Sequence, residues 1–428
     1  MASERLQGVL SHLKPTGVKA FTQKNPDDVV VTCALRTPLT KAGKGGLKDT
    51  PFENLLVSLM KSTIEKSRID PKLVEDIVCG NVNEGGAAYR CRAAALAAGF
   101  PNTTACASVN RFCSSGLFAV QTVADQIVNN SIEIGLALGI EMMSAPGQRE
   151  ALSFSEELLA CQEAQDCLQP MGQTSENIGK DFNITRELQD RWAAQSYQRA
   201  EAAQKAGWFK DEICPVKTKV KDPKTGQWHE VTVTQDDGIR AGTTFDSLQK
   251  IRPAFPKWGD KSTGGNSSQV TDGAAAVLLM RRSTAERLGQ PILAKFVGAT
   301  VTGCAPRIMG IGPSVAIPKL FEKYGITKDD VDIFEINEAF ASMMVYCMNK
   351  LGLDPKKVNP RGGAIAIGHP LGATGARQVS TILSEARRQK AKVLVSSMCI
   401  GTGQGVVGHG CGEGICFMSV SLASLCIF

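Results

Sequence analysis

The chain has 428 residues, enough for two or three domains that each bury a core, and 43% of its residues are hydrophobic, as in an ordinary globular protein. Its 48 basic and 42 acidic residues leave a net charge of +6 without a long basic block, which argues against a nucleic-acid-binding protein. No apolar run reaches the roughly 18–20 residues of a membrane span. The 14 cysteines lack paired C-x-x-C spacing, so they predict neither a metal site nor a small disulfide scaffold and favour a reducing compartment.

A targeting leader is predicted at the N-terminus. Residues 5–13 ("RLQGVLSHL") place leucine and valine at helical spacing, which predicts an apolar stripe. The segment resembles a peroxisomal targeting signal read by an import receptor, in which a basic and an aliphatic residue precede a His-Leu pair (here Arg5, Leu6, His12 and Leu13). A mitochondrial presequence is the alternative, because Glu4 is the only acidic residue before Asp27. Residues 1–27 are assigned to this leader and its linker.

From residue 28 onward, strand-like and helix-like segments alternate. Short β-branched or apolar runs predict strands, and amphipathic runs predict helices, which indicates an α/β fold with a largely parallel, buried sheet. The predicted segments before residue 144 are 28–35, 52–67, 76–82, 88–100 and 133–143, with a further helix after Cys113. Residues 144–270 mix helical stretches with Gly- and Asp-rich turns and are interpreted as an inserted loop or lid domain.

The second half of the chain repeats the first. "DIVCGN" at 76–81 corresponds to "DIFEIN" at 332–337, an offset of 256. The same offset pairs Cys113 with His369, Gly116 with Gly372, and Met143 with Cys399. We therefore divide the core into an N-terminal half (28–143, completed by a return strand and helix at 271–290) and a C-terminal half (291–407). Two such halves related by a pseudo-twofold axis would bring the helix starts after Cys113 and His369 to a common centre.

This repeat indicates three side chains as candidate catalytic groups. Cys113 precedes a predicted helix, whose N-terminal dipole favours a thiolate. His369 lies in a Gly-rich turn and is one of only four histidines. Cys399 opens a Gly-rich loop whose N–H groups can bind an anion. A buried thiol or a structural histidine is the ordinary interpretation of each residue alone, but a converging Cys and His pair is what nucleophilic catalysis requires.

Four sequence blocks resemble the thiolase family in their order and spacing. They are "VNRFCSSGL", "NEAFA", "GGAIAIGHPLGATGARQ" and "SMCIGTGQG", and the resemblance extends from residue 28 to 405. It implies duplicated βαβαβ halves in a five-layered α-β-α-β-α core with an inserted lid domain. It also implies acyltransferase activity, closest to the peroxisomal 3-ketoacyl-CoA thiolases: cleavage of 3-ketoacyl-CoA by CoA during fatty-acid β-oxidation.

The resemblance also implies roles for individual residues. Cys113 would attack the 3-keto carbon after activation by His369, and Cys399 would protonate the enolate of acetyl-CoA. Backbone N–H groups of Cys113 and Gly401 would stabilise one oxyanion, and His369 with a water held by Asn337 the other. CoA is expected as a co-substrate, with no tightly bound cofactor and no metal.

Four residues of the inserted segment are implied in binding CoA. Arg240 would lie near the nucleotide, Phe255 along the adenine or pantetheine, Ser268 on the pantetheine arm and Met171 at the thioester end. Taken singly, each is equally a surface charge, a core side chain or a turn residue. The family's paired halves also imply a homodimer.

Two features depart from the family pattern. Phe112 occupies a position that is usually glutamine, and residues 408–428 are Gly-rich and then apolar where a final strand is expected. We expect the last strand to end near Val407, leaving a sheet edge partly exposed. Two alternatives to thiolytic cleavage stay open on the sequence: condensation to acetoacetyl-CoA, and a non-catalytic acyl-CoA or lipid binder. Intact Cys113 and Cys399 argue against the binder.

Overall fold

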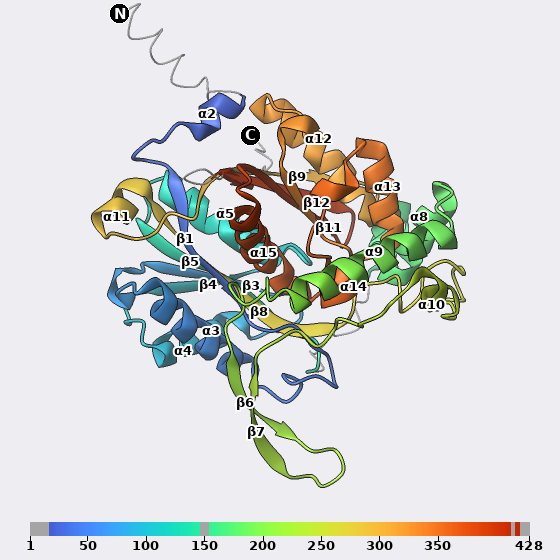
Figure 1. Ribbon diagram of the computed structural model, residues 1–428, viewed down its shortest axis with the longest axis horizontal. Coiled ribbons are helices and arrows are strands. Elements are labelled where there is room, and N and C mark those ends of the chain that lie inside the picture. Colours follow the sequence, from blue (N-terminus) through green and yellow to red (C-terminus); the bar gives the residue numbers. More distant parts are fainter. Residues whose placement is uncertain (1–16, 146–153, 412–415, 420–428) are drawn as a thin grey trace, which may run out of the picture.

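The computed structural model describes residues 17–145, 154–411 and 416–419 (Figure 1). The predicted leader helix at 5–13 lies outside these residues. A short helix, α2 (Val18–Thr22), precedes the first strand. Within the described residues no helix is both long and apolar enough to cross a membrane.

The N-terminal half is built on a five-stranded portion of the main sheet. Its strands occur in the order β1-β8-β5-β3-β4, and β2 (Thr40–Lys41) pairs with β8. Three helices cover its two faces: α3 (Phe52–Ser67), α4 (Ala87–Ala98) and α5 (Ser115–Val128). The five strands are β1 (Val29–Arg36), β3 (Asp76–Gly80), β4 (Ala105–Val109), β5 (Ile134–Met142) and β8 (Thr271–Arg281).

The C-terminal half repeats this arrangement around β9, β10, β11 and β12. Helices α12 (Gly312–Tyr324) and α13 (Ala341–Leu351) correspond to the outer helices, and α15 (Thr374–Gln389) corresponds to α5. Shorter helices are α11 (Arg282–Arg287) and α14 (Ala364–Ile367). The strands are β9 (Ala294–Gly303), β10 (Ile333–Ile336), β11 (Val393–Ile400), β12 (Gln404–Cys411) and β13 (Cys416–Ser419).

The prediction of a largely parallel sheet is wrong, because the sheet is mixed. β3 pairs in parallel with β4 and β5, and β10 with β11, as the alternating helices require. β8 is antiparallel to β1 and β5, and β12 is antiparallel to β9 and β11. Both antiparallel strands follow a loop or an insertion rather than a crossover helix, so the right-handed βαβ connection does not set their direction.

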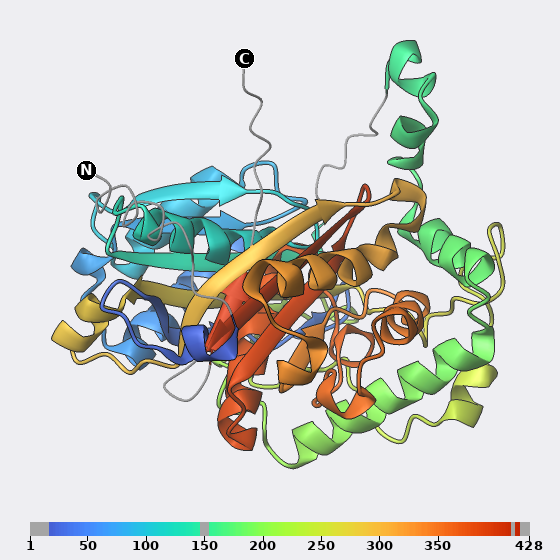
Figure 2. The same ribbon diagram turned by 90° about the horizontal axis from the view of Figure 1, so that it is seen from above.

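Three hydrophobic clusters show the order of the layers. One lies between the N-terminal strands and α3 and α4; one joins both sets of strands through α5 and α15; and the third lies under α12 and α13. The result is a five-layered α-β-α-β-α core (Figures 1 and 2), which confirms the predicted fold class. At the seam, Val29 and Phe296 are antiparallel partners of β1 and β9, which makes the two half-sheets continuous.

Glycines allow the two central helices to cross with their backbones in contact. A Cβ on Gly116 of α5 would lie 2.7 Å from the carbonyl oxygen of Gly372, and one on Gly375 of α15 would overlap the backbone of Leu117. Side chains at these positions would hold the helices apart. The starts of α5 and α15 therefore meet at the centre of the molecule, where the repeat predicted that Cys113 and His369 converge.

The inserted segment packs mainly on the C-terminal half. Helix α9 (Arg186–Lys205) contributes Ala193 and Tyr197 to the cluster under α13. A two-stranded hairpin, β6 (Val216–Lys221) and β7 (Trp228–Val233), extends away from the core in Figure 1. The other helices are α6 (Glu156–Leu159), α7 (Gln162–Asp166), α8 (Met171–Asp181) and α10 (Phe245–Gln249).

The expected end of the last strand near Val407 is wrong. β12 continues to Cys411, and its residues pair with β11 on one side and β9 on the other. Ladder hydrogen bonds involve backbone groups, so Gly408 and Gly410 can join a strand that has a neighbour on each side. β12 therefore covers the edge of β9 that we expected to be exposed, and β13 adds a further pairing with β12.

Candidate active site

Cys113 lies in a tight turn between β4 and α5. Its side chain is only 9% exposed, and the next residue, Ser114, is the N-cap of the helix. Phe112 has a φ of 47°, in the left-handed region that residues with a side chain seldom adopt. The Asn110 side-chain oxygen accepts a hydrogen bond from the Phe112 N–H at 2.9 Å and stabilises this turn. The strained turn directs the chain abruptly from the strand into the helix beside the thiol.

His369 is held in a fixed orientation and tautomer. Its Nδ1 lies 2.6 Å from the Thr374 hydroxyl, which itself lies 3.0 Å from the Pro370 carbonyl oxygen. The hydroxyl has one hydrogen and donates it to that carbonyl, so it accepts from Nδ1–H. This pattern assigns the proton to Nδ1 and leaves the lone pair on Nε2, the atom that a general base would use.

His369 is also neutral. The side chain is 4% exposed, and burial lowers its pKa from 6.5 to about 3, with the positive charge of Arg377 adding to the effect. The imidazole therefore carries no charge near neutral pH. A neutral ring with an unprotonated Nε2 can accept a proton from a thiol.

Asn337 directly follows β10 and lies beside the histidine. Its side-chain Nδ2 is 3.3 Å from His369 Nε2, and its backbone N–H donates to the Ser397 carbonyl oxygen at 2.9 Å. Its Oδ1 is buried and accepts no hydrogen bond from the described residues. The amide can therefore orient the imidazole and still accept a hydrogen bond from a substrate or a water.

Cys399 lies near the end of β11 and is fully buried. Burial raises the pKa of its thiol well above the ordinary value, and the nearby Cys113 raises it further. Cys399 is therefore protonated and within electrostatic reach of Cys113. Such a thiol can donate a proton rather than attack as a thiolate.

Gly401 begins the loop after β11. A Cβ added there would be 3.7 Å from the ring of Phe112, so the loop lies directly against the turn that carries Cys113. The next two residues, Thr402 and Gly403, both have positive φ, at 69° and 85°. This tight loop brings backbone groups close to the two thiols, but an oxyanion-binding role for Gly401 stays a prediction.

Three of the four residues expected to bind CoA lie near one another. The Phe255 ring packs on Gly172, next to Met171, and lies 6.3 Å from the ring of Phe340. The Ser268 N–H donates to the Ala339 carbonyl oxygen at 3.0 Å. Ser268 therefore adjoins the segment that begins at Asn337 and includes Phe340. Met171 is 37% exposed.

Arg240 is placed differently. It is exposed, and its guanidinium carbon lies 5.9 Å from the centre of the Tyr197 ring on α9. In the described part of the chain, no hydrogen bond, ion pair or ring contact joins it to Met171, Phe255 or Ser268. All four CoA-binding assignments therefore stay predictions, with Arg240 supported only by its exposure and charge.

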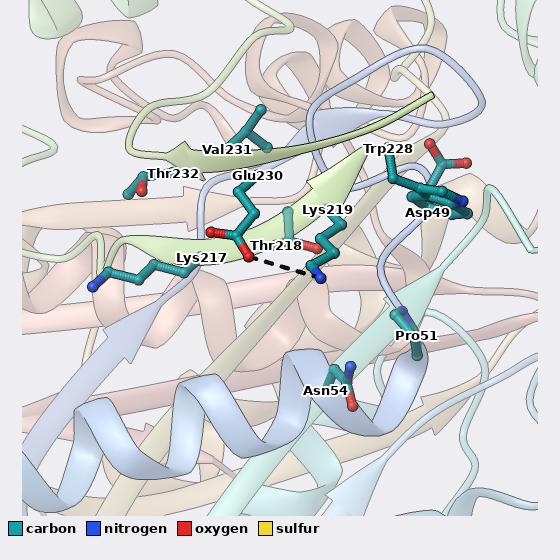
Figure 3. A pocket seen from close by; sticks show the side chains of 10 residues that line it. All are labelled: Asp49, Pro51, Asn54, Lys217, Thr218, Lys219, Trp228, Glu230, Val231 and Thr232. Carbon is teal, nitrogen blue, oxygen red and sulfur yellow. Dashed lines mark ion pairs between the residues drawn. The ribbon is translucent and has the colours of Figure 1, made fainter. Parts of the chain in front are cut away.

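A separate hollow lies away from these residues. It has a volume of about 890 Å³ and opens between the β6–β7 hairpin and the start of α3 (Figure 3). Lys219 and Glu230 form an ion pair of 3.7 Å on its hairpin wall, beside the exposed Trp228. None of the predicted site residues lines this hollow. Over residues 17–145, 154–411 and 416–419, no group of three or more His, Cys, Asp or Glu side chains can hold a metal ion.

Comparison with known protein families shows to which family the chain belongs. A family model for the thiolase N-terminal domain matches residues 29–283, and one for the thiolase C-terminal domain matches residues 290–408. Together these ranges include Cys113, His369 and Cys399. The chain belongs to the thiolase family.

Individual thiolases show how extensive the similarity is. The chain is 53% identical to the peroxisomal 3-ketoacyl-CoA thiolase of Yarrowia lipolytica over 94% of this chain and 98% of that protein. It is 46% identical to the crystal structure of the dimeric peroxisomal thiolase of Saccharomyces cerevisiae, with a TM-score of 0.84 over 91% of this chain and 98% of that one. Human mitochondrial 3-ketoacyl-CoA thiolase in complex with CoA is 35% identical, with a TM-score of 0.78 over 89% and 96%.

Within this thiolase fold, sequence reasoning missed the residues that orient the histidine. Thr374 lies within a quoted motif, and its spacing of five residues from His369 at a helix start was the available signal. The backbone N–H of His369 is bonded by the Gln269 carbonyl oxygen at 3.0 Å and by the Thr271 hydroxyl at 3.1 Å. These two residues lie about a hundred positions earlier, and no local pattern connects them with the histidine.

Proposed function

We propose that the chain is a 3-ketoacyl-CoA thiolase that uses CoA to release acetyl-CoA and a shortened acyl-CoA during fatty-acid β-oxidation in the peroxisome. One observation carries the proposal: a neutral histidine with its lone pair on Nε2 lies where the helices after Cys113 and His369 cross, and a protonated second thiol, Cys399, lies within electrostatic reach of Cys113. This set supplies a nucleophile, a base and an acid. The relatives named above support the choice of substrate.

The first half of the reaction uses all three groups. The Cys113 thiol gives its proton to His369 Nε2 and attacks the 3-keto carbon. The bond between carbons 2 and 3 then breaks, leaving the shortened acyl group on Cys113 and the enolate of acetyl-CoA. Cys399 supplies the proton that this enolate needs. His369 stabilises the enolate oxygen together with a water held by Asn337, whose amide lies 3.3 Å from the ring.

The second half transfers the acyl group. An incoming CoA thiol gives its proton to the Cys399 thiolate and attacks the thioester on Cys113. The tetrahedral oxyanion is stabilised by the backbone N–H groups of Cys113 and Gly401. Its collapse releases the shortened acyl-CoA and expels the Cys113 sulfur, which takes back the proton held on His369 Nε2. Met171, Phe255, Ser268 and Arg240 bind CoA, which acts as a co-substrate, and no resident cofactor takes part.

The proposal also covers domain boundaries, assembly and location. The inserted segment is 144–270, between halves at 28–143 with 271–290 and at 291–407, followed by an atypical tail at 408–428. The enzyme is a homodimer. The outer edge of β4 supports this state, because no described strand pairs with it and an open edge can pair with a second copy. An import receptor reads residues 5–13.

Mass spectrometry of the intact protein after mixing with a 3-ketoacyl-CoA tests the proposed function. We expect an acyl adduct that maps to Cys113 and disappears when CoA is added. Release of acetyl-CoA in equal amount would complete the half-reaction. Reversible binding without an adduct would instead support the non-catalytic acyl-CoA binder.

A further inference from the structure

A buried carboxylate beside the candidate site collects four hydrogen bonds. Glu338 is 1% exposed. Within the described residues it forms no ion pair; instead it accepts hydrogen bonds from Trp192 Nε1 (3.2 Å), Ser196 Oγ (2.6 Å), Asn359 Nδ2 (2.9 Å) and the Ile365 N–H (3.3 Å). Burying a carboxylate that forms no direct ion pair is costly, so such a group needs a full set of donors.

The four donors come from three separate parts of the chain. Trp192 and Ser196 are one turn apart on α9 of the inserted segment. Asn359 also bonds both backbone groups of Ile336, each at 2.8 Å, and so fixes the end of β10 immediately before Asn337. Ile365 lies on α14, four residues before His369.

Close packing makes this junction rigid. A Cβ on Gly363, at the start of α14, would overlap the Glu338 carboxyl group. The Gly363 N–H donates to the Ser196 hydroxyl at 3.0 Å, and this hydroxyl in turn donates to Glu338. The segment leading to His369 is therefore bonded to the carboxylate both directly, through Ile365, and through Ser196.

We propose that Glu338 is a positioning residue for the reaction. Its carboxylate fixes Asn337 and His369 relative to each other and connects both to α9, so the inserted segment contributes to catalysis as well as to CoA binding. This inference rests on the proposed function only where turnover is the measurement. A carboxylate is required because its two oxygens together accept hydrogen bonds from all four donors. A glutamine amide has only one acceptor oxygen, and its NH₂ group would face the remaining donors.

Two variants test the inference. Glu338→Gln keeps the shape and should lower kcat at least about tenfold with KM within about threefold, since a displaced catalytic pair loses transition-state rather than ground-state contacts. Ser196→Ala removes one donor and should have a smaller effect of the same kind. The double variant should lose less than the product of the two single losses, because both act through one junction.

A substrate-free measurement separates this inference from the proposed function. The rate of Cys113 alkylation by iodoacetamide, followed by peptide mass spectrometry, reports how well His369 activates the thiol. We expect it to fall in Glu338→Gln and Ser196→Ala. The matched control is Glu187→Gln on the same helix, whose carboxylate is 58% exposed and paired with Arg191, and it should match the wild type in every assay.

Specific results would overturn the inference. Unchanged alkylation and kcat in Ser196→Ala, at wild-type melting temperature, would reduce Glu338 to a stabilising residue even if Glu338→Gln does not fold. Fully multiplicative losses in the double variant would deny a shared junction. If the wild type alkylates readily but releases no acetyl-CoA, the proposed function fails, while the alkylation rates of the variants still decide the positioning role.

Discussion

Cys113 and Cys399 are close to each other but lie in different surroundings. Cys113 is at the turn before α5, whereas Cys399 is fully buried in β11 and protonated because burial raises its pKa. The two thiols therefore suit different steps, one as nucleophile and one as acid. Their substitutions should consequently fail in different ways.

Cys113→Ala should abolish both the acyl adduct and turnover, because no other group can form the thioester at that position. Cys399→Ala should retain acylation of Cys113 by a simple acyl-CoA while cleavage of 3-ketoacyl-CoA falls about 10²–10⁴-fold for lack of a proton donor. Single-turnover mass spectrometry and acetyl-CoA release measure the two steps. Cys161→Ala, at an exposed thiol, is the control. Equal loss of both steps in Cys399→Ala would indicate a structural role.

The low pKa of His369 makes a prediction about stability. In the unfolded chain the imidazole binds a proton below about pH 6.5, but in the folded protein its pKa is about 3. The stability associated with the neutral ring is therefore present above pH 6.5 and lost as the pH falls toward 3. Urea unfolding at pH 7.5 and pH 5 should show that His369→Asn loses less stability than the wild type, by about 2 kcal/mol.

The control for this measurement is the exposed hairpin residue His229. His229→Asn should show the same loss of stability between the two pH values as the wild type. If His369→Asn also follows the wild type, folding does not lower the pKa of the imidazole, and the ring is protonated in the folded protein below about pH 6.5.

The sequence identified the residues that we propose carry the chemistry but not the residues that orient them. Cys113 and His369 stood out because the repeat aligned them and because each is followed by a glycine and a helix. Glu338 lies in the "NEAFA" block, but neither it nor Asn359 is aligned with a reactive side chain by the repeat. Their role depends on Trp192 and Ser196, which precede Glu338 by about 140 residues. Such contacts exist only after the inserted segment packs against the C-terminal half.

At the scale of elements, the crossing of α5 and α15 depends on glycine. Gly116→Ala would place a Cβ 2.7 Å from the Gly372 carbonyl oxygen, so the helices would have to move apart. We expect a loss of about 1–3 kcal/mol in stability and also a loss in kcat, because Cys113 and His369, the proposed catalytic residues, precede these helices. Gly85→Ala is the control, since nothing lies within 4 Å of a Cβ there. Equal thermal melting and activity of the two variants would contradict the close crossing.

The leader is an element that only a targeting experiment can test. If the apolar stripe of residues 5–13 is read by the peroxisomal receptor, residues 1–26 fused to a fluorescent protein should enter peroxisomes. Leu6→Arg should leave the fusion in the cytosol because it places a charge in the stripe. Colocalisation with organelle markers measures the result, and accumulation in mitochondria would favour the presequence alternative.

At the scale of the whole molecule, the duplication made the architecture predictable. A repeat at an offset of 256 residues, with alternating strands and helices, indicated two halves joined through their central helices, and the layers agree. Strand direction was not predictable in the same way. Period and composition indicate that β8 and β12 are strands, but whether a strand enters parallel or antiparallel depends on where the preceding loop delivers the chain.

The end of β12 is the part of the fold on which sequence reasoning failed, and it bears on how the halves are joined. Phe296 of β9 pairs with Val29 of β1 on one side and with Gly410 of β12 on the other. Residues 408–411 therefore cover the strand that makes the two half-sheets continuous. The high glycine content of this stretch predicted a weak strand. The stretch nevertheless forms a strand because its backbone is hydrogen-bonded to a neighbouring strand on each side.

This arrangement predicts that two truncated chains differ sharply in stability. A chain ending after Cys411 keeps the full pairing of β12 with β9 and β11, whereas one ending after Val407 leaves the backbone groups opposite residues 408–411 unpaired at the seam. Each lost backbone hydrogen bond costs about 1 kcal/mol, so the shorter chain should lose several kcal/mol, melt at lower temperature and give less soluble protein. Thermal melting of both chains beside the full-length protein measures the difference. If the two truncated chains melt at the same temperature, residues 408–411 contribute nothing to the seam, and the strand ends in effect at Val407, as its glycines first suggested.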